Sequence, residues 1–378
     1  MKKFLLLTLM IYSLFSITIY SQEEYIKGKI LKLEDCLSPE EEVEELKEIL
    51  LYDVVIMEGE RKGDKILVEF PIYREDAFNI NVKEGDNIVL YHDIDEEGNE
   101  KYYVADKDKR NDIIYLGALF VITTLAFSKF KGFKAMIALL LVVVFIYKVF
   151  IPGIIVGYSP ILLSVATALF ASIITIYLMT GFNNKGIIAI LGAIGGVLVA
   201  GILSFIFVNS MRLTGYVTTE ALNYASMLQN IKIKEVISAG VILGSMGAVM
   251  DVAMSISSAL NEIKEKNQDI HRKELFLSGM RIGSDIIGTM INTLILAYIG
   301  SSLMTTIFIY LQKSQYPLIR ILNFESIVVE ILRAFCGSIG ILVAVPITAY
   351  VAQKNKLNFH QLLKKINFKT EKLVLLFY

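Results

Sequence analysis

Three carboxylates lie inside long apolar runs of this chain: Asp251, Asp285 and Glu330. Other acidic residues are scarce in the same region, because residues 113–378 hold only 11 of the 38 acids of the chain. A carboxylate inside a bilayer costs roughly 2.5–3.5 kcal/mol on insertion scales, so by default it marks a functional site. Such a group can carry a proton or line the path of an ion.

The run around Asp251 places further polar residues at helical spacing. Ser255, Ser258 and Glu262 follow at i+4, i+7 and i+11, which puts all four side chains on one face of a helix. This face could line a path for water or an ion. For the two serines we favour the simpler alternative, a hydrogen-bonded seam between helices. For Asp251 we favour a function, because loss of hydration favours the protonated form and makes this carboxyl a candidate proton carrier.

The run around Asp285 repeats this arrangement. Thr289 and Asn292 follow at i+4 and i+7 on one helical face. Arg281 precedes Asp285 by one turn and could keep it ionised, so a structural ion pair is the alternative to a role in transport. Asp251 and Asp285 could in principle form a protease pair, since paired aspartates share one proton. Neither lies in a recognised protease motif, and we expect no enzymatic activity.

Glu330 and Arg333 are spaced i, i+3 and can pair on one helical face. Paired charges in a membrane helix face the interior of a bundle or a cavity. Arg333 could instead bridge to a carboxylate on another helix. The polar core that we predict for transport consists of Asp251, Ser255, Ser258, Asp285, Thr289, Asn292, Glu330 and Arg333.

The elements that carry these residues are predicted membrane helices. A mean hydropathy of +0.57 with 54% hydrophobic residues is too apolar for a soluble chain of 378 residues. The stretch Leu275–Leu311 is too long for one span, and we expect it to break near Gly300-Ser301-Ser302, with the remainder at the outer interface. In the predicted span at 186–208, Gly192 and Gly196 indicate a face that packs closely against another helix. Apolar runs of about 20 residues place seven spans at 113–127, 134–151, 159–181, 186–208, 235–261, 276–300 and 325–351.

Charge divides the chain into an acidic and a basic part. Residues 22–112 hold 27 acids and 13 bases, whereas the remainder holds 24 bases and 11 acids. With the acidic part outside, the predicted cytoplasmic loops and tail contain 15 lysines and arginines, against 5 in the outer loops. We therefore expect residues 22–111 outside the cytoplasm, a membrane domain over 112–352 and a basic cytoplasmic tail at 353–378. An acidic outer domain argues against nucleic-acid binding.

Residues 22–111 are predicted to form a small β-rich domain. A helical insertion is expected to begin at Ser38-Pro39-Glu40-Glu41, with Val43, Leu46 and Leu50 at helical spacing and a solvated acidic face. Five strands favour a small closed barrel, which resembles the OB type. Runs rich in β-branched and aromatic residues place these strands at 25–33, 51–57, 65–70, 86–91 and 101–105.

The remaining features limit the function further. Residues 1–21 are a signal sequence or an uncleaved membrane anchor, and we slightly favour the anchor because Ile19 fits a cleavage site poorly. Cys36 and Cys336 fall in different parts of the chain and are not expected to be bonded. The three histidines are far apart in sequence, and no phosphate-binding loop is present. We therefore expect neither a metal nor a cofactor.

Three segments of the membrane part resemble the YibE/F-like bacterial membrane proteins. They are Gly247–Ser258, Arg281–Tyr298 and Glu330–Gly340. The second segment carries Ile287 where the family more often has methionine. The resemblance implies a protein of the bacterial cytoplasmic (inner) membrane, with a leading hydrophobic segment, an extracytoplasmic domain and about seven spans. It implies no substrate and no catalytic residue.

The fold expected from these observations is an α-helical polytopic membrane bundle of about seven spans with a small extracytoplasmic β-rich domain. The function we expect is that of a secondary transporter or permease for an unknown ion or small molecule. Intramembrane carboxylates beside glycine-rich spans favour it, although no inverted repeat is visible. The alternative is a non-transporting accessory, assembly or receptor protein whose extracytoplasmic domain binds a protein partner.

Overall fold

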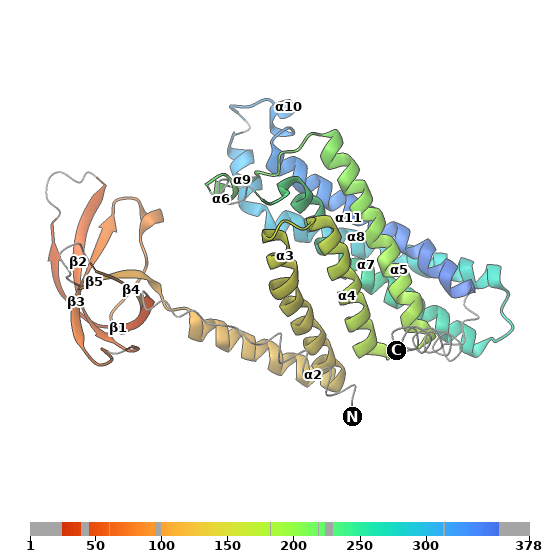
Figure 1. The fold of residues 1–378 in the computed structure, drawn as a ribbon, viewed down its shortest axis with the longest axis horizontal. Coiled ribbons are helices and arrows are strands. Elements are labelled where there is room, and N and C mark those ends of the chain that lie inside the picture. The colour runs from red at the N-terminus through yellow and green to blue at the C-terminus, as the bar shows by residue number, and fades with distance from the viewer. Residues whose placement is uncertain are drawn as a thin grey trace, which may run out of the picture. The chain divides into compact units, whose positions relative to one another are not determined.

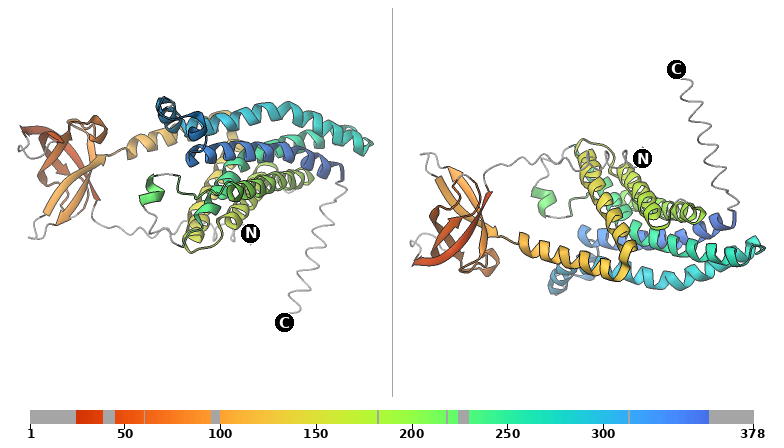
Figure 2. Two further views of the ribbon diagram at one scale, coloured as in Figure 1. Left: turned by 90° about the horizontal axis from the view of Figure 1, so that it is seen from above. Right: turned by 90° about the horizontal axis from the view of Figure 1, so that it is seen from below.

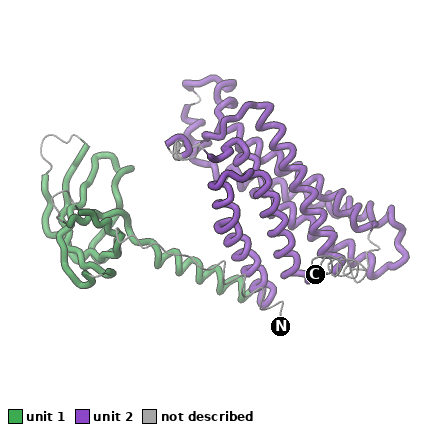
Figure 3. Tube along the Cα trace, in the orientation of Figure 1, with its two compact units in different colours: residues 1–127 green, residues 128–378 purple. Residues whose placement is uncertain are grey.

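The computed structural model describes residues 25–38, 45–59, 61–94, 100–181, 183–217, 219–223, 230–312 and 314–354. The chain divides into two compact units, residues 1–127 and 128–378 (Figure 3). The predicted signal sequence or anchor at 1–21 lies outside the described residues, as does the tail beyond Lys354.

The first unit contains one five-stranded antiparallel sheet in the order β3-β2-β1-β4-β5 (Figure 1). All five predicted strands are therefore confirmed. Alternate residues point into a common core, in which Ile30, Val54, Val68, Ile88 and Leu90 are fully buried. The strands are β1 (Tyr25–Leu37), β2 (Leu46–Ile56), β3 (Lys65–Tyr73), β4 (Asn87–Ile94) and β5 (Glu100–Lys107), with a short 3-10 helix η1 (Asp76–Phe78) between β3 and β4.

The helix predicted after Ser38 is wrong over its described part, because β2 already begins at Leu46. Leu50 is paired on both sides, with Cys36 of β1 and Phe70 of β3. These pairings place the residues of β2 alternately toward the core, and this period of two overrides the helical spacing of Leu46 and Leu50. Residues 39–44, which carry the cap signal, lie outside the described part of the chain.

The first two predicted spans fall in one continuous helical stretch of 46 residues, Arg110–Ile155. It comprises α2 (Arg110–Phe145), a π-helical turn η2 (Ile146–Phe150) and α3 (Ile151–Ile155). A straight helix of this length would measure about 69 Å, roughly twice the hydrocarbon thickness of a bilayer. The backbone leaves helical geometry at Lys129, with φ 48° and ψ −131°, so α2 is two helices joined at a kink.

Five further helices in the described residues are long and apolar enough to cross a membrane, which gives six in total against the seven spans predicted. Ser159 caps the first of them, and Asn183 caps the second through its Oδ1, which accepts from Gly186 N at 2.8 Å. The five are α4 (Pro160–Thr180), α5 (Asn184–Ser210), α7 (Ile233–Lys266), α8 (Arg272–Ser301) and α11 (Glu325–Lys354).

The long apolar stretch Leu275–Leu311 breaks where the sequence predicts. Helix α8 ends at Ser301, and a separate helix α9 (Leu303–Gln312) follows Ser302. The hydroxyls of both serines donate to the carbonyl of Tyr298, at 2.9 and 2.8 Å, and so satisfy a carbonyl at the helix end. Two short helices, α6 (Thr219–Asn223) and α10 (Leu318–Ile321), lie in the connections.

Helices α5, α7 and α11 run side by side at the centre of the second unit (Figures 1 and 2). Small residues bring them close together. A Cβ added to Gly196 would lie 2.6 Å from the carbonyl oxygen of Gly340, and one added to Gly192 would lie 2.0 Å from Thr348 Oγ1. The glycines of the fourth predicted span therefore form a packing face, as expected.

Connections that the sequence assigns to one side of a membrane lie at one end of this unit. Glu325, at the start of α11, accepts hydrogen bonds from Thr214 N at 2.7 Å and Gly215 N at 2.6 Å. At the other end, Ser257 Oγ donates to the carbonyl of Lys185 at 2.6 Å. Helix α5 therefore runs antiparallel to both α7 and α11, and the membrane topology, with the side that faces the cytoplasm, stays a prediction.

Candidate functional site

The charged pair predicted on the last span is formed. Arg333 Nη1 donates to Glu330 Oε1 at 2.6 Å, one turn apart on α11. Both side chains are largely covered, with 30% of Arg333 and 25% of Glu330 exposed. The ion pair faces α7, because a Cβ added to Gly240 would lie 3.5 Å from Arg333 Nη2.

A tyrosine that we did not predict joins this pair. Tyr298, near the end of α8, places its hydroxyl against α7, where a Cβ added to Gly244 would lie 2.5 Å from the Oη atom. Gly240 and Gly244 are one turn apart, so the missing side chains of α7 make room for both polar groups. The Tyr298 hydroxyl also lies near α11, because a Cβ added to Gly337, one turn after Arg333, would lie 3.9 Å from the Oη atom.

Three buried polar atoms of this cluster have no hydrogen-bond partner among the described residues. They are Tyr298 Oη, Glu330 Oε2 and Arg333 Nε. Native proteins satisfy most buried polar atoms, so three such atoms in one place need an explanation. Two of them are donors and one is an acceptor, which suits a small polar guest that can both accept and donate hydrogen bonds. We call Tyr298, Glu330 and Arg333 the buried triad.

The polar face predicted on α7 lies at the surface of the unit. Asp251 and Ser255 are exposed and Ser258 is half-buried. Neither serine has an interhelical hydrogen bond within the described residues. The serine seam that we expected is formed by other positions: Ser204 Oγ donates to Ser238 Oγ at 3.2 Å between α5 and α7, and Ser257 bonds the start of α5.

The polar face predicted on α8 points away from the bundle. Gly283 packs against Val345 and Ile256, and Asp285 lies two residues further, about 200° around the helix axis. Asp285, Thr289 and Asn292 are exposed. The alternative considered for Asp285, an ion pair with Arg281, is not formed in the described part of the chain. Asp285 therefore does not face α7, and it does not meet Asp251 as a protease pair would require.

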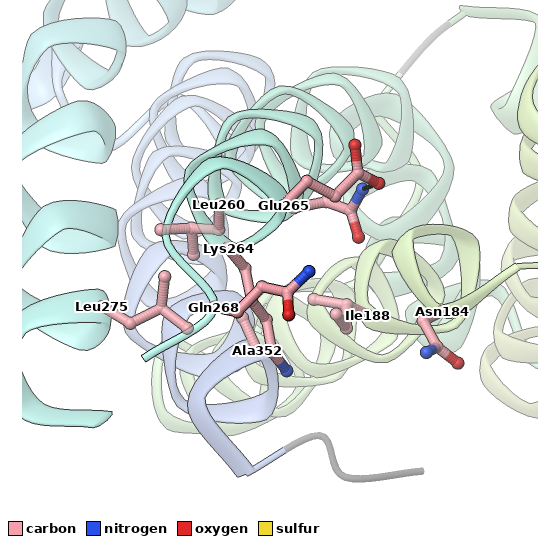
Figure 4. A pocket seen from close by; sticks show the side chains of 9 residues that line it. Asn184, Ile188, Leu260, Lys264, Glu265, Gln268, Leu275 and Ala352 are labelled. Atoms are coloured by element: carbon pink, nitrogen blue, oxygen red, sulfur yellow. Dashed lines mark hydrogen bonds between the residues drawn. The ribbon is translucent and has the colours of Figure 1, made fainter. Parts of the chain in front are cut away.

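A cavity of about 320 Å³ opens at the far end of the bundle from the buried triad (Figure 4). Ile188, Leu260, Leu275 and Ala352 provide its apolar wall. Its polar lining consists of Asn184, Asn261, Lys264, Glu265 and Gln268, with Asn261 Nδ2 donating to Glu265 Oε1 at 2.7 Å. Along α7, Gly244 and Lys264 are 20 residues apart, or about 30 Å.

Another polar pocket lies in the sheet domain. A groove of about 450 Å³ runs along β3 and β5 and includes Arg61, Glu100 and Tyr102. Arg61 pairs with Glu100, and the His92 ring stacks on Tyr102 at 4.8 Å between centroids. His92 Nε2 is buried and has no hydrogen-bond partner among the described residues.

The sequence could identify the pair on α11 because both residues lie in one helix. It could not identify Tyr298, because the contact depends on how α7, α8 and α11 align. The available signal was the spacing of Gly240 and Gly244, which predicts that something approaches α7 there but not that the neighbour is polar.

Comparison with known proteins supports the resemblance noted in the sequence. A family model described as YibE/F-like protein matches residues 116–356, more than half of the chain. The matched region includes the buried triad and the polar faces of α7 and α8. No curated protein and no solved structure matches the chain. The chain belongs to the YibE/F-like family.

Proposed function

We propose that this protein is a secondary transporter or permease of the bacterial cytoplasmic membrane, with residues 22–111 outside. One observation carries the proposal: the buried triad holds three polar atoms without a partner among the described residues, inside a bundle of apolar helices. Hydrogen-bonded packing would have paired these atoms, since an unmade buried hydrogen bond costs about 1–3 kcal/mol. A site that exchanges its guest tolerates that cost.

The chemistry of the triad suits an ion or a small polar molecule. Glu330 presents one free carboxylate oxygen and can accept a proton, whereas Arg333 compensates its charge. Tyr298 adds a hydroxyl that can donate to a guest or accept from it. Binding of a proton at Glu330 would weaken its bond to Arg333, which couples protonation to the packing of α11 against α7.

Asp251 is the second carboxylate that we propose to carry the proton or ion. It lies near the middle of α7, between the triad at one end of the helix and the polar cavity at the other. The surface that it shares with Ser255 and Ser258 would form a hydrated face leading toward that cavity. Two carboxylates at different depths are what a stepwise path for a proton or ion requires.

Flux through proteoliposomes tests this proposal. The purified full chain is reconstituted with a pH-sensitive dye inside, and ions and small metabolites are added outside one class at a time. Wild-type protein should move protons with at least one class. Glu330→Gln and Asp251→Asn should lower that flux by about tenfold or more, because an amide cannot carry a proton.

The matched control is Glu274→Gln, which makes the same carboxylate-to-amide change at the exposed start of α8, outside both the buried triad and the lining of the cavity. This variant should transport as the wild type does. Wild-type flux in Glu330→Gln would contradict the role of the triad. No flux from folded wild-type protein with any class would favour the alternative function.

That alternative is an accessory or receptor protein that binds a partner through its outer domain. The groove along β3 and β5 favours it, because exposed charges and aromatic rings lie together there. Arg61→Ala with Tyr102→Ala should then abolish capture of the partner and leave flux unchanged. We also propose that the five strands close into the OB-like barrel predicted from the sequence. The strand order and the contact between β3 and β5 support this closure. In neither function do we propose an enzyme.

A further inference from the structure

Helix α8 leaves a polar face uncovered. Only 11% of its most apolar window is buried, compared with 56% for α7 and 50% for α11. Figure 2 shows α8 at one edge of the bundle, beside α11. Its inner side packs through Gly279, Gly283 and Leu294, which are buried. Among the described residues of the second unit, no element covers the outer side.

The uncovered side carries a continuous stripe of charged, polar and small residues. All of its members are exposed, and they follow one another at spacings of one, three or four residues on one helical face. A Cβ added to Gly288 would meet nothing within 4 Å. We call this set the α8 stripe, and it consists of Arg281, Ser284, Asp285, Gly288, Thr289 and Asn292.

Lipid is a poor neighbour for this stripe. Arg281 and Asp285 have no ion-pair partner among the described residues, and each charge costs roughly 2.5–3.5 kcal/mol when it faces hydrocarbon on insertion scales. Thr289 satisfies its hydroxyl on the carbonyl of Ile286 at 2.9 Å, but Asn292 has no such bond in the described part of the chain. The stripe therefore requires a polar partner of its own length, about 17 Å from Arg281 to Asn292.

We propose that the partner is a second copy of this chain, which packs its own α8 stripe against the first. Two copies inserted with the same orientation are related by a two-fold axis along the membrane normal, so each stripe faces itself. Arg281 of either copy then lies one turn from Asp285 of the other, and two reciprocal ion pairs form. Asn292 can pair with its symmetry mate through their amides.

The same stripe contains small residues that allow the two helices to approach each other closely. Ser284 and Gly288 are four residues apart, and small residues at this spacing let membrane helices pack backbone to backbone. Two other apolar segments of the chain, Phe4–Tyr20 and residues 113–127, offer no charge to this stripe. Charge complementarity therefore selects a second copy over either segment.

Cysteine cross-linking of the full chain in its native membrane tests the dimer. Cys36 is exposed and is first changed to serine, whereas Cys336 is buried in α11 and stays. Single cysteines are then introduced along α8, and two differently tagged copies are expressed together. Ser284→Cys, Gly288→Cys and Asn292→Cys should form disulfide-linked dimers several-fold more than Ile286→Cys and Met290→Cys, which face the bundle.

Ile202→Cys is the matched control, because Ile202 is 58% exposed on α5, outside the proposed interface. Equal cross-linking at Ile202 and Gly288, or no helical periodicity along α8, would overturn the proposal. Gly117→Cys, added to the Gly288→Cys variant, tests whether residues 113–127 of the same chain cover the α8 stripe instead. An internal cross-link between these two cysteines in place of the intermolecular one would also overturn it.

Exchanging the charges of Arg281 and Asp285 gives a result that unfolding of a variant could not produce. Arg281→Glu and Asp285→Arg should each lower the dimer fraction when expressed alone, because like charges then meet across the axis. Expressed together with different tags, the two variants should form mixed dimers in preference to either homodimer. Mixed and homodimers at the statistical ratio would contradict the pairing of Arg281 with Asp285. The result does not depend on transport, so this inference and the proposed function can fail separately.

Discussion

Polar and charged side chains differ in how fully they are paired in the sheet domain and in the helical unit. In the sheet domain they pair both at the surface, as Lys107 does with Asp86 at 3.1 Å, and in the interior, as Asp108 does with Arg110 at 2.9 Å. In the helical unit Glu330 and Arg333 also pair, but with Tyr298 they keep three buried atoms without a partner among the described residues. An unpaired polar group costs little in water and much in a membrane. Unpaired groups among the helices therefore indicate a guest or a partner, whereas paired groups in the sheet domain indicate stability.

The largest effect should come from the close packing of α5 against α11. Gly196→Val would drive its Cβ against the carbonyl oxygen of Gly340, which is backbone and cannot turn aside. We expect a loss of about 3 kcal/mol or more in the free energy of unfolding, measured by thermal unfolding in detergent. Gly300→Ala is the control, because a Cβ there meets nothing within 4 Å. Equal stability of the two variants would refute the α5–α11 contact.

Breaking the buried pair from one side should have the next largest effect. Arg333→Leu leaves the Glu330 carboxylate partly buried and uncompensated, at a cost of about 3 kcal/mol. The double variant with Glu330→Gln removes the stranded charge, and we expect it to recover part of that stability. A double variant less stable than Arg333→Leu alone would show that the two side chains do not act as a pair.

The sheet domain should respond to acid through Asp108, whose side chain is only 1% exposed. Hydrogen bonds from Arg110 hold the pKa of this carboxyl well below its usual range, and Lys27 at 3.3 Å adds to the effect. The stabilisation is complete above the unfolded-state pKa near 3.9 and is lost as the pH falls through the lower folded-state pKa. Asp108→Asn should remove roughly 2 kcal/mol at neutral pH.

Hydrogen exchange of β1 and β5 in the full chain measures this effect. Protection in wild-type protein should fall below about pH 4, whereas in Asp108→Asn it should already be low at neutral pH and change less with acid. Identical pH profiles would mean that Asp108 does not hold Lys27 and Arg110 in place.

The smallest effect should be local. Glu325→Gln weakens three hydrogen bonds that fix the connection after α5, from Thr214 N, Thr214 Oγ1 and Gly215 N. We expect a loss of about 1 kcal/mol, confined to faster exchange of residues 211–217. Glu262→Gln, where the carboxylate pairs with Lys266 at the exposed end of α7, should leave that segment unchanged. Faster exchange in both variants would remove the special role of Glu325.

Features set within one helix were predictable from the sequence. The Glu330–Arg333 pair and the break at Gly300–Ser302 both follow from local spacing and composition. The spacing around Asp285 also showed which residues share a face. It did not show that this face points away from the bundle, because that direction is set by the contacts of Gly283 with α7 and α11.

Features that depend on pairing between distant segments were not predictable. The helix expected after Ser38 had correct local signals, but Leu50 pairs with two other strands, and that pairing decides its conformation. Tyr298 was missed for the same reason, because only the alignment of three helices brings its hydroxyl to Gly244. The kink at Lys129 was also not predicted, and it lies between the first two spans that composition predicts, within one helical stretch.

Tyr298→Phe tests most directly whether the unpaired atoms of the buried triad serve transport. The change removes one hydroxyl, keeps the shape of the ring against Gly244 and deletes no hydrogen bond of that hydroxyl within the described residues. Unfolding in detergent and flux in proteoliposomes are measured on the same preparation. We expect unchanged or higher stability together with a flux reduced by about tenfold, which corresponds to the roughly 1.4 kcal/mol of one hydrogen bond to the transported guest. Unchanged flux in the stable variant would contradict this expectation and assign the triad to packing alone.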